Sequence, residues 1–309
     1  MPGEHSRIAN GGLVRLGIAG IEFAVHSPVR LQCEEAGDCY EGFWIPPATS
    51  SGGTSVDIHL TLRDSPPIDK ARPLFDGQSW FLFGDGDLRY LKAHGSTPAE
   101  PRWLARFGLH PEEATVFCGQ VLVSTRDGET TISSPVHYPL DQLLLMYVLA
   151  SRDGAVLHAA GGRVRDRGYL FAGSSSAGKS TLSRLLTASG QAAVLSDDRM
   201  VVREVAGEWW AYGTPWPGEA GVAMNERMPL SAVFFLHHSQ GNSIQRCSKA
   251  DALKALLPVA SIPWYERELV SAMLSFIETL LLQVPCFDLH FRPGVEVVEM
   301  LSRFDPADA

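Results

Sequence analysis

A glycine-rich segment in the second half of the chain has the residue types needed to hold phosphate groups. Residues 173–180 read GSSSAGKS and match the pattern GxxxxGK[ST] at every fixed position. Glycines let the backbone curl so that successive N–H groups face a phosphate, and the helix that follows adds a partial positive charge. The segment therefore predicts a P-loop that binds a nucleoside triphosphate, with ATP and Mg²⁺ as the expected ligands.

Two side chains at the end of this segment are suited to particular parts of the ligand. The ammonium group of Lys179 can reach the β- and γ-phosphate oxygens, and the hydroxyl of Ser180 can ligate Mg²⁺. The predicted nucleotide-binding residues are Gly173, Ser174, Ser175, Ser176, Ala177, Gly178, Lys179, Ser180 and Thr181.

Phosphoryl transfer also needs a carboxylate that faces the metal or deprotonates the attacking group. Asp197 and Asp198 are the candidates, because they follow the apolar run at residues 192–195, with only Ser196 between. In an α/β sheet the carboxyl end of such a strand is where ligands bind. The alternative is an ordinary solvated turn, since Ser-Asp-Asp is also common in loops.

The elements around the P-loop alternate between strand and helix. We expect a strand at residues 155–160, a turn at Gly161-Gly162, and a second strand that ends at Ala172. The helix predicted at residues 179–187 follows the loop, and the strand at 192–195 leads into the acidic pair. This alternation is typical of an α/β domain with a P-loop.

Four later segments are predicted to complete this domain. They are a strand at 231–236, a helix at 249–257, an amphipathic helix at 267–283 and a strand at 286–291.

The first part of the chain has a different pattern. Residues 12–135 consist mostly of short alternating runs broken by Gly, Pro and Asp, which predicts strands and hairpins. Turns at residues 84–87 and at Asp127-Gly128 predict two of these hairpins. Because helical spacing begins at Leu140, we expect a β-rich N-terminal domain at 1–138 and the P-loop domain at 139–309. The first domain is expected to position the substrate or to regulate the second.

Composition limits the classes of partner. The formal net charge of −9 disfavours binding to nucleic acid, and the apolar runs are too short for a membrane span. The five cysteines have no CxxC pair and are expected to be reduced thiols. Since the start of the chain also lacks the pattern of a secretion signal, we expect a cytoplasmic protein.

The residues around the P-loop resemble the carboxyl-terminal domain of HPr kinase/phosphorylase. The resemblance rests on residues 157–160 (LHAA), the strand before the loop, the loop itself, and residues 194–199 (VLSDDR). Order and spacing agree over roughly residues 155 to 200, and more loosely to about 300. Domains of that family have a nucleotide-binding core similar to that of phosphoenolpyruvate carboxykinases, and they phosphorylate a serine of a protein.

The resemblance implies roles for individual residues. Asp197 would be the base that takes the hydroxyl proton, Asp198 would bind the metal or orient the base, and His158 would assist the site. On sequence alone His158 is equally well explained as a satisfied histidine at the end of a strand. Ser174 and Thr181 stand where the family usually has acidic residues.

The run at residues 212–219 (YGTPWPGE) resembles a segment of divergent HPr-kinase-related proteins, some of which phosphorylate a peptide serine. Glu219 in this run is a candidate metal ligand, although a structural turn is nearly as good an explanation. The adjacent residues His237 and His238 point to opposite faces of a strand, which argues against a metal site there.

The expected function is therefore an ATP-dependent kinase that transfers the γ-phosphate to a serine-type hydroxyl of a protein or peptide. Lys179 would stabilise the developing charge, and Mg²⁺ would be held by Ser180, Asp198 and Glu219. Two alternatives stay open, a non-catalytic ATP-binding regulatory module and a small-molecule kinase. Relatives of this kind often assemble, so a homo-oligomer is also open.

Overall fold

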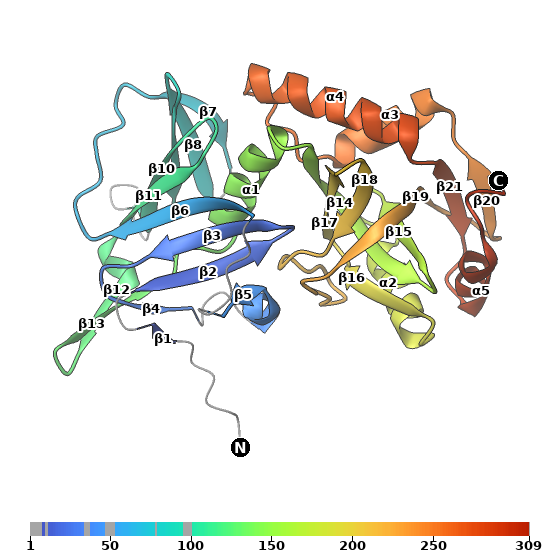
Figure 1. Ribbon diagram of the computed structural model, residues 1–309, viewed down its shortest axis with the longest axis horizontal. Coiled ribbons are helices and arrows are strands. Elements are labelled where there is room, and N and C mark those ends of the chain that lie inside the picture. Colours follow the sequence, from blue (N-terminus) through green and yellow to red (C-terminus); the bar gives the residue numbers. More distant parts are fainter. Residues whose placement is uncertain are drawn as a thin grey trace. The chain divides into compact units, whose positions relative to one another are not determined.

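The computed structural model describes residues 8–9, 12–33, 38–46, 53–77, 79–94 and 101–308. The chain divides into two compact units, residues 1–148 and 149–309 (Figure 1). The division falls within helix α1 (Leu140–Ala150), whereas the sequence pattern suggested a boundary before this helix. Each unit contains its own sheets.

The first unit is built from strands. They are β1 (Ile8–Ala9), β2 (Leu13–Ile18), β3 (Ile21–His26), β4 (Arg30–Gln32), β5 (Trp44–Ile45), β6 (Thr54–Thr61), β7 (Arg72–Asp76), β8 (Trp80–Asp85), β9 (Leu88–Ala93), β10 (Trp103–Gly108), β11 (Glu113–Cys118), β12 (Val123–Arg126) and β13 (Glu129–Ser133), with two short 3₁₀ helices, η2 (Asp38–Phe43) and η3 (Gln120–Leu122).

Within the described residues these strands form two sheets. Nine strands follow the order β5-β2-β3-β6-β11-β10-β9-β8-β7, and four follow the order β1-β4-β13-β12. Both predicted hairpins are confirmed, as β8–β9 and β12–β13. The second turns at Asp127-Gly128, where both residues have positive φ as a type I′ turn requires. Helix α1 packs on this unit through Tyr147, whose ring meets Phe107 edge-on at 5.3 Å.

The second unit combines strands and helices. Its elements are β14 (Gly154–Val164), β15 (Arg167–Ala172), α2 (Lys179–Ala188), β16 (Ala192–Ser196), β17 (Arg199–Val205), β18 (Glu208–Tyr212), β19 (Arg227–His238), β20 (Ser243–Arg246), α3 (Lys249–Leu256), η4 (Leu257–Val259), α4 (Arg267–Gln283), β21 (Cys286–Phe291) and α5 (Val295–Arg303). The helices and strands predicted after residue 178 are all present, which confirms a mixed α/β architecture.

Two long strands, β14 and β19, organise the sheet of this unit. In the described residues the strand order is β15-β14-β17-β18-β19-β21-β20, with β16 paired to β14 and a further pairing of β15 with β19. Strands β15, β19 and β21 run parallel and lie side by side (Figure 1). Helices α2 and α5 bury their apolar residues against this parallel part, around Tyr169, Phe171 and Phe234. The carboxyl ends of the three strands therefore meet at one edge, which is where the loop at residues 173–180 begins.

The predicted turn at Gly161-Gly162 is wrong. Strand β14 continues through both glycines to Val164, and the chain reverses at Arg165-Asp166 instead. Glycine is needed at position 162, where the backbone of the neighbouring strand comes close, whereas at position 161 the close atom is the flexible end of a side chain. A Cβ on Gly161 would lie 2.7 Å from the Met200 side chain, and one on Gly162 would lie 2.7 Å from the Ala193 carbonyl oxygen.

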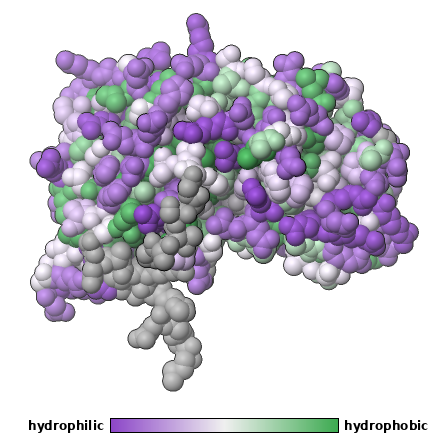
Figure 2. Space-filling model, in the orientation of Figure 1, coloured by the Kyte–Doolittle hydropathy of each residue, from purple (hydrophilic) through white to green (hydrophobic). Residues whose placement is uncertain are grey.

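Helices α3 and α4 complete the second unit. Helix α4 is tied to β18 through Trp209, which donates a hydrogen bond to the Gln283 side chain and packs its ring on Phe276. No helix in the described part of the chain is long and apolar enough to cross a membrane. The face drawn in Figure 2 mixes hydrophilic and hydrophobic residues over both units. Cys118, Cys247 and Cys286 are thiols, as predicted.

Candidate active site

The segment between β15 and α2 has the backbone shape of a tight anion-binding loop. Ser176 and Gly178 have φ values of 68° and 97°, in the left-handed region. The loop closes on itself through a hydrogen bond of 3.2 Å from the Ala177 N–H to the Ser174 carbonyl. Gly178 is the N-cap of α2, so the first N–H groups of this helix open directly onto the loop.

Lys179 is folded back over the loop. Its Nζ donates hydrogen bonds of 2.8 and 3.0 Å to the carbonyl oxygens of Gly173 and Ser174, and the residue is only 6% exposed. Burial lowers the pKa of Lys179 below its ordinary value, Arg199 acts in the same direction, and Asp198 opposes the shift. Because an ammonium group has three hydrogens, one N–H remains for an oxygen of a bound phosphate. The side chain thus fits its predicted role.

Strand β14 brings the acidic pair close to the loop. Its residue Ala159 pairs with Ala172, the last residue of β15. On the other edge of β14, Ser196 lies opposite Gly161 and Arg199 lies opposite His158. The residues directly before and after the acidic pair are therefore in the same antiparallel register with β14. Asp197 and Asp198 therefore form a two-residue interruption between β16 and β17, which follow one another along β14. The pair thus follows the carboxyl end of β16, as predicted, and β17 begins directly after it.

Asp197 is completely buried and binds backbone. Its Oδ1 accepts hydrogen bonds from the N–H groups of Gly218 (2.9 Å) and Val222 (3.1 Å), and its Oδ2 accepts one from Ala220 (2.7 Å). A buried carboxylate is stabilised by such charge-assisted bonds. In this conformation the carboxylate anchors the turn at residues 218–222 and has no surface that an external hydroxyl could reach.

Asp198 is the accessible member of the pair. Its Oδ1 lies 2.9 Å from Nε2 of His158 and its Oδ2 lies 3.0 Å from the Arg199 guanidinium, while 30% of the side chain stays exposed. Burial by itself would raise the pKa of Asp198, but the His158 hydrogen bond and the positive charges of Arg199 and Lys179 outweigh it. The pKa is therefore below its ordinary value, and the group is ionised at neutral pH.

The segment after β18 covers this edge. It runs back along β16, where the Met224 N–H donates to the Leu195 carbonyl at 2.9 Å. The Thr214 hydroxyl donates to the Arg199 carbonyl at 2.7 Å. A Cβ on Gly218 would lie 2.8 Å from Asp197 Oδ2, so the covering turn packs directly on the acidic pair. The run at residues 212–219 also contains Gly213, where a Cβ would lie 2.1 Å from the Met224 carbonyl oxygen, so both glycines are needed for this packing.

Glu219 does not join the acidic pair. Its side chain is 85% exposed and lies 4.0 Å from the Arg184 guanidinium, while its backbone carbonyl accepts a 2.9 Å hydrogen bond from the same group. Within the residues that the structure describes, no group of three or more His, Cys, Asp and Glu side chains is arranged to hold a metal ion. The prediction of Glu219 as a metal ligand finds no support here. Ser180 and Thr181, by contrast, lie partly exposed in the first turn of α2 beside the loop.

Three residues contact the site although no role was predicted for them. Arg199 forms an ion pair with Asp198, Arg184 links α2 to the turn at 218–222, and His238 contacts the Ser176 carbonyl of the loop. Arg199 directly follows the acidic pair, and Arg184 lies on the same helix as Lys179, so proximity in sequence was an available signal for both. His238 is distant in sequence and could be found only from the pairing of β15 with β19.

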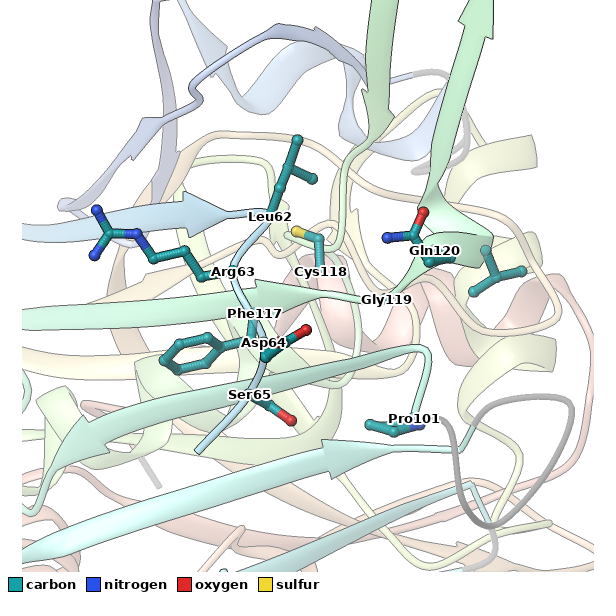
Figure 3. Close-up of a pocket in the computed structure, with 10 residues that line it drawn as sticks. Leu62, Arg63, Asp64, Ser65, Pro101, Phe117, Cys118, Gly119 and Gln120 are labelled. Atoms are coloured by element: carbon teal, nitrogen blue, oxygen red, sulfur yellow. The ribbon is translucent and has the colours of Figure 1, made fainter. Parts of the chain in front are cut away.

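A separate hollow of about 300 Å³ lies in the first unit (Figure 3). Residues 62–65 after β6 and residues 117–121 at the end of β11 line it, together with Pro101. Burial raises the pKa of the Cys118 thiol in this hollow to about 12, so the thiol is protonated and unreactive at neutral pH. None of the residues predicted to bind or transfer phosphate lies there.

Comparisons with known proteins show only a distant similarity. No family model matches the chain, and neither does any curated protein. The solved structure of the Hpr(Ser) kinase/phosphatase from Coxiella burnetii is 14% identical over 48% of this chain and 86% of that chain, with a TM-score of 0.29. A TM-score of this size does not establish a common fold. Function must therefore be inferred from the geometry of this chain.

Proposed function

We propose that this protein is an ATP-dependent kinase that transfers the γ-phosphate to a serine-type hydroxyl of a protein or peptide. The observation that carries the proposal is that β14 brings the loop at 173–180 and the ionised, accessible carboxylate of Asp198 to one edge of the sheet. A phosphate-binding loop next to a proton acceptor is the minimum arrangement for phosphoryl transfer.

The loop fits the triphosphate of ATP. Its backbone N–H groups, the amino terminus of α2 and the remaining N–H of Lys179 would bind the phosphate oxygens. Mg²⁺ would be held by the Ser180 hydroxyl and the phosphates themselves, and it would neutralise the charge that develops on the phosphate oxygens. Glu219 is left out of this set because its carboxylate is exposed beside Arg184.

The proton acceptor in this proposal is Asp198. Each of its oxygens uses one lone pair for His158 or Arg199 and keeps another for the acceptor hydroxyl. The hydroxyl oxygen would bond to the γ-phosphorus as the bond to the β,γ-bridging oxygen breaks, ADP would leave, and Asp198 would take the proton. Asp197 would act indirectly, by holding the turn that covers the site.

Transfer of labelled phosphate tests this proposal. Purified protein is incubated with γ-labelled ATP, Mg²⁺ and a library of serine-containing peptides, with a matched library in which alanine replaces serine. We expect label in the serine library only. We also expect Asp198→Asn to reduce the rate by about a hundredfold or more, because a positioned base contributes about 10²–10⁴-fold.

A matched variant tests whether the loss of any His–Asp pair would lower the rate of transfer. Asp288 forms a 2.6 Å pair with His237 away from the acidic pair, and Asp288→Asn should leave the rate within about twofold. Asp198→Asn should keep ATP affinity within about threefold, whereas an equal loss of binding and transfer would show a metal-binding role instead. Label that moves only to water or only to a small molecule would overturn the proposed protein or peptide acceptor.

A further inference from the structure

The outer side of the P-loop is covered by two aromatic residues. His238 and Phe291 are the last residues of the parallel strands β19 and β21, at the edge from which the loop departs (Figure 1). Their rings are stacked with centroids 6.0 Å apart. A Cβ on Gly178 would lie 2.8 Å from Cζ of Phe291 and 3.3 Å from Cε1 of His238. The two rings therefore pack directly against the glycine that begins α2.

His238 also fixes the orientation of one peptide group of the loop. Its Nε2 lies 2.8 Å from the carbonyl oxygen of Ser176, a residue with positive φ. Because a carbonyl oxygen can only accept, Nε2 must carry the hydrogen. The N–H of the same peptide group belongs to Ala177 and donates to the Ser174 carbonyl. This peptide is thus held at both ends, immediately before the N–H groups that open α2.

We propose that His238, supported by Phe291, is a positioning residue that holds the P-loop in its phosphate-binding shape and thereby sets the affinity for the triphosphate. The proposal rests on the proposed function, since it requires that the loop binds ATP. A loop that is ordered before its ligand arrives loses less conformational entropy on binding. Ser176 has a positive φ of 68°, a backbone conformation that is costly for most residues other than glycine, so an external support is physically reasonable.

The neighbouring histidine provides a matched control. His237 precedes His238 in β19 and points to the other face of the strand, where its Nε2 lies 2.6 Å from Asp288 and its ring stacks on His290. Replacing His237 removes a similar hydrogen bond and a similar ring contact without touching the loop.

The test compares His238→Phe, which keeps a ring but has no donor, with His238→Gln, which keeps a donor. Dissociation constants for ATP with Mg²⁺ and for inorganic tripolyphosphate are measured by calorimetry for both variants, for His237→Phe and for the unchanged protein. We expect His238→Phe to weaken both ligands by about three- to tenfold, the effect of losing one hydrogen bond. His238→Gln and His237→Phe should stay within about twofold of the unchanged protein.

Thermal unfolding without ligand identifies any variant that fails to fold, and His238→Leu, which also lacks a donor, then replaces His238→Phe. Equal affinities of His238→Phe and the unchanged protein would overturn the inference and leave the proposed function intact. Equal losses in the Phe and Gln variants would overturn the hydrogen-bonding role. An unchanged protein that binds neither ATP nor tripolyphosphate would overturn both proposals.

Discussion

At the scale of single residues, two adjacent carboxylates have opposite environments. Asp197 has no exposed surface and accepts hydrogen bonds from three backbone N–H groups, whereas Asp198 is 30% exposed and contacts His158 and Arg199. The proposed base is therefore the second aspartate, although the family resemblance suggested the first. The sequence could not distinguish the two aspartates, because the N–H groups that bind Asp197 belong to residues more than twenty positions later in the chain.

The contact between His158 and Asp198 affects the pH dependence of transfer. The hydrogen bond from His158 lowers the pKa of Asp198, so His158→Ala should raise that pKa. A base works only when it is ionised, and activity is lost as pH falls through its pKa. The acidic limb of the kcat/KM profile should therefore move to higher pH in this variant.

His26→Ala is the control for this profile, because His26 forms a comparable 2.6 Å pair with Asp57 in the first unit. It should leave the acidic limb where it is. An unmoved limb in His158→Ala would contradict the assignment of Asp198 as the base.

At the scale of elements, the turn at residues 218–222 depends on Asp197. In Asp197→Asn the amide nitrogen would face one of the three N–H donors of the turn, and a buried charge-assisted hydrogen bond would be lost. We expect the free energy of unfolding to fall by about 2 kcal/mol, measured by urea denaturation. Glu219→Gln removes the same kind of charge from the exposed side of this turn and should change it by less than about 0.5 kcal/mol. Similar changes in the free energy of unfolding for both variants would refute the anchoring role of Asp197.

Elements defined by local pattern were predictable, and those defined by pairing between distant strands were not. The turn chemistry of Asp127-Gly128 and the strand–loop–helix order around Lys179 are local, and both were predicted correctly. Gly161-Gly162 looked like a turn because glycine usually breaks strands. Both glycines lie within β14 instead, where their lack of a side chain lets Met200 and Ala193 of the neighbouring strands approach closely. The position of His238 beside the loop likewise depends on parallel strand pairing, because His238 and Ser176 are 62 residues apart in the chain.

At the scale of the whole molecule, the chain consists of a strand-rich first unit and a mixed α/β second unit. All residues of the proposed phosphate chemistry lie in the second unit. A substrate-positioning or regulatory role for the first unit, the cytoplasmic location and self-association stay predictions. The net charge of −9 still argues against nucleic acid as the acceptor or partner.

The most direct measurement of the central claim is a calorimetric titration of the full-length protein with ATP in the presence of Mg²⁺. Binding at one site is predicted, weakened by about tenfold or more in Lys179→Ala, since a buried ammonium contributes charge-assisted hydrogen bonds to phosphate. Lys249→Ala, at the start of α3, should bind ATP like the unchanged protein. Absence of ATP binding, or equal binding in Lys179→Ala, would contradict the account.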